Sequence, residues 1–236
     1  MSSTTSIMLS LPVSGRDHVQ GRPVAPTTLV EYGDYECPRC GEAHSIVKEL
    51  QKRLGNQLRF VFRHFPITTV HAHAQHAAEA AEATGAQRRF WEMHDTLFAN
   101  QGALSDKHLE AYAKQNGLDL TQFNREMIAH AHVVRVREDF LSGVRSGVDG
   151  TPTFFINDVR HDGTYELESL SAAIIDATWS HRILTERSYR LLRLRMMHSI
   201  LTLFAGNAGA GKLQLTKAEP DEAFPLAQGH HQLPML

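Results

Sequence analysis

The pair of cysteines at positions 37 and 40 constrains the fold of this chain more than any other sequence feature. Cys37 and Cys40 are the only two cysteines among 236 residues, and Pro38 and Arg39 separate them. Two cysteines are too few for a disulfide scaffold, so redox chemistry or metal binding is the better interpretation of the pair. A run rich in β-formers over 27–32 precedes them, and apolar residues at helical spacing follow. The sequence therefore predicts a strand, a tight turn and a helix that begins at the cysteines.

The remaining patterns divide the chain into three predicted parts. Residues 1–26 are polar and irregular and form an N-terminal arm, 27–177 form one α/β domain, and 178–236 form a basic helix followed by a disordered tail. Within the domain the expected elements are strand, helix, strand, several helices, strand, strand and helix. They cover 27–32, 38–54, 58–65, about 68–147, 153–156, a short strand from 159, and 166–176. This order predicts an α/β sheet with a helical subdomain inserted between its two halves.

The composition is that of an ordinary globular chain. Apolar residues make up 42% of it and the formal net charge is -2, without the basic excess that is typical of nucleic-acid binding. Its apolar runs are short, whereas roughly 20 residues are needed to span a bilayer. No basic residue precedes the partly apolar stretch 7–13, as a secretory signal would require. We therefore expect a cytoplasmic protein that neither spans a membrane nor binds nucleic acid.

The position of the cysteines at a helix start favours thiol-disulfide exchange. Exchange needs a thiolate that attacks and a second thiol that resolves the mixed disulfide. Cys37 would occupy the N-cap, with Pro38 at the first helical position, where a missing N–H costs nothing. The sulfur of Cys37 would face the backbone donors of Arg39 and Cys40, and the charge of Arg39 would add to them. We expect a lowered pKa at Cys37 and a less exposed Cys40 that can close a disulfide.

Two further interpretations concern residues near the pair. Glu31 lies in the preceding strand; if its side chain points inward beneath Cys40, its pKa would be raised and it could carry the proton of that thiol. The alternative is an exposed carboxylate at the strand edge. Cys37, Cys40 and His44 also have ligand types suited to a metal, but a closed zinc site needs a fourth ligand and no second Cys-x-x-Cys exists. We therefore expect no metal at the pair.

Two other patterns receive no function. Residues 206–212 fit the first part of a phosphate-binding loop, but Leu213 stands where a Ser or Thr would bind the metal, and too few residues follow for a nucleotide domain. The chain also has fifteen histidines, and no carboxylate or cysteine accompanies the grouped ones at matching spacing. We expect these on solvated helix surfaces: His71, His73, His76, His130 and His132.

The residues around the cysteines resemble those of a known family. Positions 29–41 read Leu-Val-Glu-Tyr-Gly-Asp-Tyr-Glu-Cys-Pro-Arg-Cys-Gly, and positions 150–157 read Gly-Thr-Pro-Thr-Phe-Phe-Ile-Asn. Over about residues 20–177 the chain closely resembles DsbA-like proteins, which are bacterial oxidoreductases of the thioredoxin superfamily with an inserted helical domain. The resemblance implies a thioredoxin-like fold of the DsbA-like type. A similar module is also found attached to sodium/proton antiporters.

The resemblance implies a role for each residue of the two motifs. Cys37 would be the nucleophile, Cys40 the resolving thiol and Glu31 the buried acid. Pro152, which follows Thr151, looks like the cis-proline of the family, whose loop lies against the active site and binds the substrate backbone.

The predicted function is therefore that of a protein disulfide oxidoreductase or isomerase. Its redox group would be the Cys37–Cys40 disulfide, without a further cofactor, and its partners would be protein or peptide thiols and disulfides, with glutathione or a thioredoxin-like protein to restore the pair. Pro38 and Arg39 would tune the site, but this dipeptide differs from the Pro-His or Pro-Tyr more familiar in the family, so the direction of electron flow stays open. The alternative is a thioredoxin-like module that binds a partner without catalysis.

Overall fold

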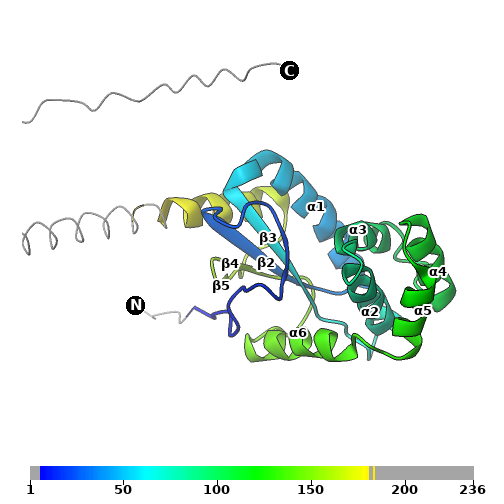
Figure 1. Ribbon diagram of the computed structural model, residues 1–236. Helices are drawn as coiled ribbons and strands as arrows, with labels where there is room; N and C mark the ends of the chain where they lie inside the picture. Colours follow the sequence, from blue (N-terminus) through cyan, green and yellow to red (C-terminus); the bar gives the residue numbers. More distant parts are fainter. Residues whose placement is uncertain (1–5, 181–182, 184–236) are drawn as a thin grey trace, which may run out of the picture. The chain divides into compact units, whose positions relative to one another are not determined.

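The computed structural model describes residues 6–180 and residue 183, and this part of the chain forms a mixed sheet with helices around it (Figure 1). The strands are β1 His18–Gln20, β2 Thr27–Gly33, β3 Leu58–His64, β4 Thr153–Ile156 and β5 Val159–Arg160. The helices are α1 Pro38–Leu54, α2 Ala74–Gly85, α3 Phe90–Ala99, α4 Asp106–Gln115, α5 Leu120–Ile128 and α6 Val133–Arg145, with a short 3-10 helix at Gly55–Gln57. Residues 167–180 are also helical. The predicted α/β fold with a helical insertion is confirmed.

The strands lie in the order β1-β3-β2-β4-β5, so the strand that leads to the cysteines lies at the centre. β2 is parallel to β3 and antiparallel to β4, and all seven of its residues are buried. β4 and β5 form a hairpin whose turn residues Asn157 and Asp158 have φ values of 47° and 68°. Positive φ at both turn positions suits the right-handed twist of the strands, and Asn and Asp tolerate it well. The hairpin turn predicted at these positions is confirmed.

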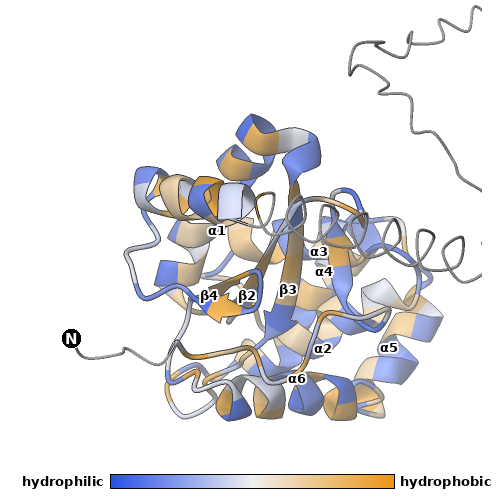
Figure 2. Cartoon of the chain, turned by 90° about the vertical axis from the view of Figure 1, so that its left-hand side faces the viewer, coloured by the Kyte–Doolittle hydropathy of each residue, from blue (hydrophilic) through white to orange (hydrophobic). Residues whose placement is uncertain are grey.

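Helices cover both faces of the sheet. In Figure 1, α1 lies on one side of the strands and α6 on the other, while α2 to α5 gather beyond one end of the sheet. Leu29 of β2 packs in the core beneath α1, whereas Val30 and Tyr32 pack in the opposite core. Since side chains two positions apart share a face of a strand, Glu31 is directed to the α1 side with Leu29. Figure 2 shows the corresponding hydropathy, with β3 hydrophobic over most of its length and both colours on the helices.

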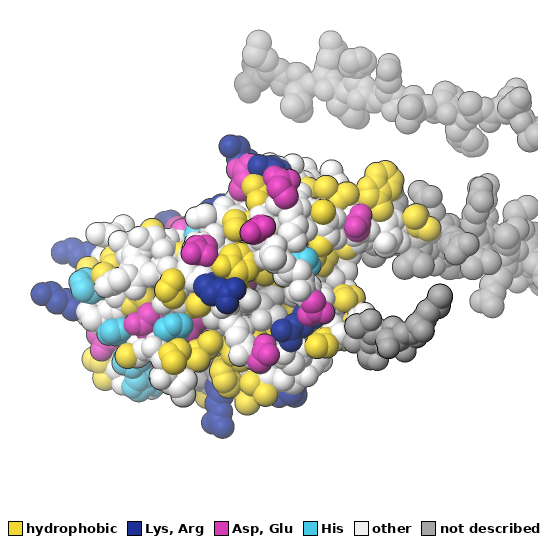
Figure 3. Space-filling model, turned by 180° about the vertical axis from the view of Figure 1, so that it is seen from behind, with side chains coloured by type: hydrophobic (Ala, Val, Ile, Leu, Met, Phe, Trp, Pro, Cys, Tyr) yellow, Lys and Arg dark blue, Asp and Glu magenta, His cyan; other side chains and the backbone are white. Residues whose placement is uncertain are grey.

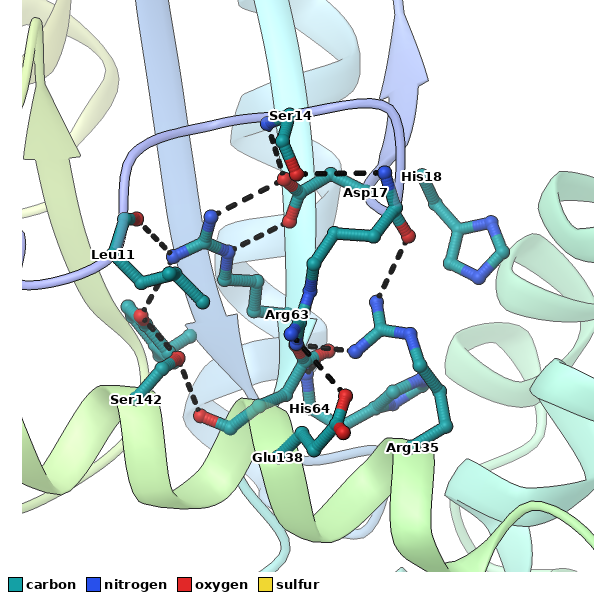
Figure 4. Close-up of polar contacts among 12 residues, drawn as sticks. Leu11, Ser14, Asp17, His18, Arg63, His64, Arg135, Glu138 and Ser142 are labelled. Carbon is teal, nitrogen blue, oxygen red and sulfur yellow. Dashed lines mark hydrogen bonds and ion pairs between the residues drawn. The ribbon is translucent and has the colours of Figure 1, made fainter.

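The N-terminal arm has more structure than the irregular pattern of residues 1–26 predicted. His18–Gln20 form β1, which pairs with β3 at the edge of the sheet, and Met8 forms a bridge with Val159. The buried Arg63 of β3 forms hydrogen bonds to the N-terminal arm. Its Nε donates to Asp17 Oδ1 at 2.8 Å and its Nη1 to the carbonyl oxygen of Leu11 at 2.8 Å (Figure 4). Sequence patterns missed β1 because three half-buried residues show no usable alternation.

Two of the sequence predictions fall on residues outside the described part. Only residues 178–180 and 183 of the predicted basic helix and tail are described, and the run 206–212 lies wholly beyond them. Within the described residues, no helix combines the length and the apolar character that crossing a bilayer requires.

Candidate active site

Cys37 stands where the turn after β2 becomes α1. Its backbone N–H donates to the carbonyl oxygen of Asp34 at 3.2 Å, which closes this turn. Cys37 is the N-cap of α1 with φ -74° and ψ 119°, and Pro38 is the first helical residue, as predicted. This position places the Cys37 sulfur near the backbone N–H groups of the first helical turn. Both cysteines are free thiols in this structure.

The two thiols have opposite acidity. The pKa of Cys37 is lowered to about 5, and the largest cause is a hydrogen bond that the Cys40 thiol donates to the Cys37 sulfur. Hydrogen bonds from Thr151 and from the backbone N–H groups of Cys40 and Arg39 lower this pKa further, while burial opposes the shift. Burial raises the pKa of Cys40 well above its ordinary value, and the hydrogen bond to Cys37 and the charge of Glu31 act in the same direction. At neutral pH the pair therefore holds a thiolate at position 37 and a thiol at position 40.

Glu31 is a buried acid on the α1 side of the sheet. Its side chain is only 1% exposed, which excludes the alternative of a carboxylate at an exposed strand edge. Burial, and then the nearby charge of Cys37, raise the pKa of Glu31 to about 8, and its Oε1 has no hydrogen-bond partner. A carboxyl group with this pKa can take up or release a proton near neutral pH beside the resolving thiol.

The loop of Thr151 and Pro152, which directly precedes β4, lies against Cys37. The peptide bond between these two residues is cis, as the resemblance implied. The Cys37 sulfur lies 3.5 Å from the carbonyl oxygen of Thr151, so this loop contacts the reactive sulfur directly. A groove of about 730 Å³ runs beside the loop, and its lining includes Pro152, Arg39 and Tyr165. The site thus places an open groove next to the thiolate.

Arg39 contributes to the site through both its backbone N–H and its side chain. Its guanidinium lies over the ring of Tyr165, 5.6 Å from the centroid, and a hydrogen bond with Tyr165 is the main reason that the pKa of Arg39 is raised. The backbone N–H of Arg39 is among the groups that lower the pKa of Cys37, and the charge of Cys37 is among the causes of the raised pKa of Arg39. The sequence prediction that the guanidinium charge helps to stabilise the thiolate stays a prediction, because the two charges attract one another while Tyr165 is the main partner of the side chain.

Gln101, in the segment after α3, was not predicted from the sequence. Its side-chain amide donates to the carbonyl oxygens of Tyr35 at 2.9 Å and Cys37 at 2.7 Å, and so holds the turn between β2 and α1 against the helical insertion. Gly41 lies against the same amide, and a Cβ atom there would overlap the Gln101 side chain. A single glutamine in a loop carries no sequence signal that could have identified it.

Asp34, which the sequence indicated only as a turn residue, also stabilises the turn between β2 and α1 through hydrogen bonds. Its Oδ1 accepts from the backbone N–H of Glu36 at 2.8 Å, and its Oδ2 accepts from the backbone N–H of Ile67 at 2.8 Å and from His71 Nδ1 at 2.8 Å. Burial alone would lower the pKa of His71, but the hydrogen bond and charge of Asp34 outweigh it, and the pKa of His71 is raised. An aspartate in a turn is a signal for local hydrogen bonds, but its distant partners follow only from the fold.

The other histidines that the sequence singled out carry acidic partners. The ion-pair partners are His73 with Glu36, His76 with Asp106, His130 with Glu79 and His132 with Glu126. Figure 3 shows histidine side chains beside acidic ones on the surface of the helical part. Sequence spacing did not reveal these carboxylates because most of them come from other elements of the fold.

The cysteines and His44 do not form the metal site that the sequence left as an alternative. In the described part of the chain, neither Cys37 nor Cys40 belongs to a group of three side chains placed to hold a metal ion. His44 lies instead with His94 and Asp95 of α3.

A cysteine pair of opposite acidity at a helix start, facing a cis-proline loop on a sheet with a helical insertion, is the arrangement of DsbA-like members of the thioredoxin superfamily. The chain belongs to the thioredoxin family, since the family model described as Thioredoxin matches residues 13–176.

Solved structures of this type resemble the chain over most of their length. Oxidised BdbD from Bacillus subtilis has a TM-score of 0.67 and 22% identity, and the match covers 74% of this chain and 99% of BdbD. A thioredoxin-like oxidoreductase from Silicibacter pomeroyi DSS-3 has a TM-score of 0.63 and 29% identity, and the match covers 70% of this chain and 93% of the oxidoreductase. The DsbA-like fold is therefore confirmed.

Curated relatives include much longer proteins. The Na(+)/H(+) antiporter NhaA 1 of Salinispora arenicola (strain CNS-205) is 51% identical over 172 residues, which are 72% of this chain and 26% of the antiporter. The chain thus spans about a quarter of the length of this relative.

Proposed function

We propose that the chain is a thiol-disulfide oxidoreductase that exchanges disulfides with protein or peptide substrates through Cys37 and Cys40. The observation that carries the proposal is the opposite acidity of the pair, with a pKa of about 5 at Cys37 and a raised pKa at Cys40. An ordinary thiol of pKa about 8.5 is mostly protonated at neutral pH, and only the thiolate attacks a disulfide. The pair therefore has an attacking sulfur that is ionised and a resolving sulfur that stays protonated until the mixed disulfide has formed.

With this arrangement, the pair can reduce a substrate disulfide in two steps. The Cys37 thiolate attacks one sulfur of the substrate disulfide, forms a mixed disulfide and releases the other substrate sulfur as a thiolate. In the mixed disulfide Cys37 carries no charge, so one cause of the raised pKa of Glu31 is removed. The ionised form of Glu31 then takes the proton of Cys40, and the Cys40 sulfur attacks Cys37 and displaces the substrate as a thiolate. Two electrons have passed to the substrate, and the protein holds the Cys37–Cys40 disulfide. The oxidising direction uses the same steps in reverse.

The lowered pKa of Cys37 favours net oxidation of substrates. A stabilised thiolate stabilises the dithiol form of the protein, and a pair whose reduced form is stabilised is a strong oxidant when it is a disulfide. We propose that glutathione or a thioredoxin-like protein exchanges electrons with the pair. The cytoplasmic location expected from the sequence stays a prediction.

The groove beside Pro152 supports a peptide substrate. It is lined by Arg39, Pro152, Phe154 and Tyr165 and by both acidic and basic side chains, so it offers apolar surface and charge together. Thr151 is also part of the lining, and its carbonyl oxygen lies 3.5 Å from the Cys37 sulfur. An extended chain in the groove would bring its own disulfide to that sulfur.

Two activity assays of the full chain test the proposal: the rate at which it refolds a protein with scrambled disulfides and the rate at which it reduces insulin. The parent should catalyse one or both reactions, Cys37→Ser should be inactive, and Cys40→Ala should accumulate mixed disulfides with its substrate. Equal activity in the parent and Cys37→Ser would remove the proposal.

The same variants test the alternative of a binding module. A module that only binds would hold its partner as well in the Cys37→Ser variant as in the parent, and no covalent adduct would form with Cys40→Ala. Loss of partner capture in Cys37→Ser, together with a covalent adduct in Cys40→Ala, is the result that exchange chemistry predicts.

A further inference from the structure

A second group of side chains lies one helical turn beyond Cys40, between α1 and α3. His44 of α1 and His94 and Asp95 of α3 each offer one ligand atom, and these three atoms lie within 4.8 Å of one another. The proposed disulfide exchange uses none of these residues. Two imidazoles and a carboxylate are the ligand types that zinc and similar divalent transition metals prefer.

The spacing between two of these groups suits an ion better than a direct contact. His44 Nε2 and Asp95 Oδ1 are 3.5 Å apart, whereas a hydrogen bond to nitrogen usually measures roughly 2.7–3.2 Å. Asp95 Oδ1 is buried and has no hydrogen-bond partner. In a tetrahedral zinc site with bonds of about 2.1 Å, two ligand atoms lie about 3.4 Å apart. The unpartnered oxygen and the imidazole nitrogen therefore have the separation of two zinc ligands.

Neighbouring hydrogen bonds orient these groups. The Tyr35 hydroxyl lies 3.1 Å from His94 Nδ1, and this hydrogen bond does not involve the Nε2 atom of His94. Histidines that bind metals usually have their second nitrogen in such a hydrogen bond. Lys48 Nζ donates to Asp95 Oδ2 at 2.7 Å and leaves Oδ1 free.

The other group of three potential ligands in the described part of the chain already has arginine partners. His64, Glu82 and Asp139 are also close together, but Asp139 is paired with Arg16 at 2.9 Å and with Arg135. Glu82 accepts hydrogen bonds from His64 and from a second histidine. Arg135 Nε also lies 3.8 Å from Glu82 Oε1, so arginine side chains accompany both carboxylates and this cluster is a structural network.

We propose that His44, His94 and Asp95 form an open three-ligand site for a divalent transition metal of the zinc type, with water in the remaining position. A metal there would join α1, which carries the cysteines, to α3 of the helical insertion. The charge of Lys48 weakens the attraction for a cation, so the site should bind more weakly than a closed site with four ligands.

The test is calorimetric titration of the full chain with zinc chloride in a Cys37→Ser, Cys40→Ser double variant. Without the cysteines, neither exchange activity nor thiolate binding enters the result, so the test is independent of the proposed function. We expect one zinc ion per chain and a rise in melting temperature on binding. His44→Gln and Asp95→Asn should each weaken binding by at least the roughly 10- to 100-fold that loss of a supporting group costs at metal sites.

His76→Gln is the matched control, because His76 and His130 form another histidine pair, with ring centroids 5.4 Å apart, on the surface of the helical part. This variant should bind zinc as the double variant does. Absence of zinc binding in the double variant would overturn the proposal. Unchanged affinity in both His44→Gln and Asp95→Asn, or a loss confined to His76→Gln, would overturn it as well.

Discussion

Cys37 and Cys40 carry the same side chain, and only their surroundings make them differ. A shift in the pKa of Cys37 from 9.0 to about 5 corresponds to roughly 5 kcal/mol. A helix dipole contributes roughly 0.3–1 kcal/mol, and about 2 kcal/mol in favourable sites. The hydrogen bonds to the sulfur, first of all that from the Cys40 thiol, must therefore supply most of the stabilisation.

The first residue-scale prediction concerns the donors to Cys37. Cys40→Ala removes the largest of them and should raise the pKa of Cys37 clearly above 5, as measured by thiolate absorbance against pH. Arg39→Gln keeps the backbone N–H and should change this pKa much less. A rise in Arg39→Gln as large as that in Cys40→Ala would show that the guanidinium charge, and not the hydrogen bonds, stabilises the thiolate.

The second residue-scale prediction concerns Glu31. Because its pKa is raised from 4.5 to about 8, the folded protein keeps a proton that the unfolded chain releases, and stability falls as the pH rises through this window. Glu31→Gln removes this cost, so it should stabilise the protein above about pH 8, by at most about 5 kcal/mol, and leave it little changed near pH 4.

Urea unfolding of parent and Glu31→Gln at both ends of this pH range measures the difference. Stabilities that differ by the same amount at both ends would contradict a buried acid that titrates near pH 8. The variant should also resolve mixed disulfides more slowly, since Gln cannot take the proton of Cys40.

At the scale of elements, the turn between β2 and α1 depends on a side chain from the helical insertion. Gln101→Ala removes two hydrogen bonds to the backbone of Tyr35 and Cys37 and should cost about 1–3 kcal/mol of unfolding free energy in urea. It should also change the alkylation rate of Cys37, because the turn is no longer held.

Gln87→Ala is the matched control for Gln101→Ala. Gln87 also makes two side-chain hydrogen bonds to backbone, both to Asp119 and both exposed. This variant should leave the alkylation rate of Cys37 unchanged. Equal rates in parent and Gln101→Ala would contradict a role of Gln101 at the site.

The elements that could be predicted from the sequence are those with a local pattern. The helix Pro38–Leu54 and the strand Thr153–Ile156 have the predicted bounds, because apolar spacing, Pro38 and the turn residues 157–158 mark them locally. β1 could not be predicted, because its stability comes from pairing with β3, which only the fold provides. Gln101 was missed for the same reason, since its bonds span more than sixty positions.

The site shows the same division between local and distant information. Cys37, Cys40 and Pro152 belong to short motifs and could be identified from them. For Glu31 the sequence left two alternatives, and only its place on the α1 face of β2 decides between them. The packing of the Arg39 side chain on Tyr165 depends on a residue far along the chain, so the sequence could not predict it.

At the scale of the whole molecule, a buried ion pair joins the N-terminal arm to the sheet. The side chains of Arg63 and Asp17 are both fully buried, and Arg63 also donates to Tyr32 at 3.0 Å. Asp17→Ala would leave the guanidinium buried without its counter-charge and should cost roughly 3–5 kcal/mol of unfolding free energy. Urea unfolding measures this cost.

Asp162→Ala is the control at this scale, because Asp162 is exposed and its pairing with Arg160 is at the surface. It should cost at most about 1 kcal/mol. Similar losses in Asp17→Ala and Asp162→Ala would show that the arm contributes little to the stability of the fold.

The rate at which iodoacetamide alkylates Cys37 in the reduced full chain, measured from about pH 3 to pH 10, tests the thiolate most directly. The account predicts a single transition with a midpoint near pH 5, and no modification of Cys40 while the protein stays folded. A midpoint near the ordinary thiol value of about 8.5 would contradict it.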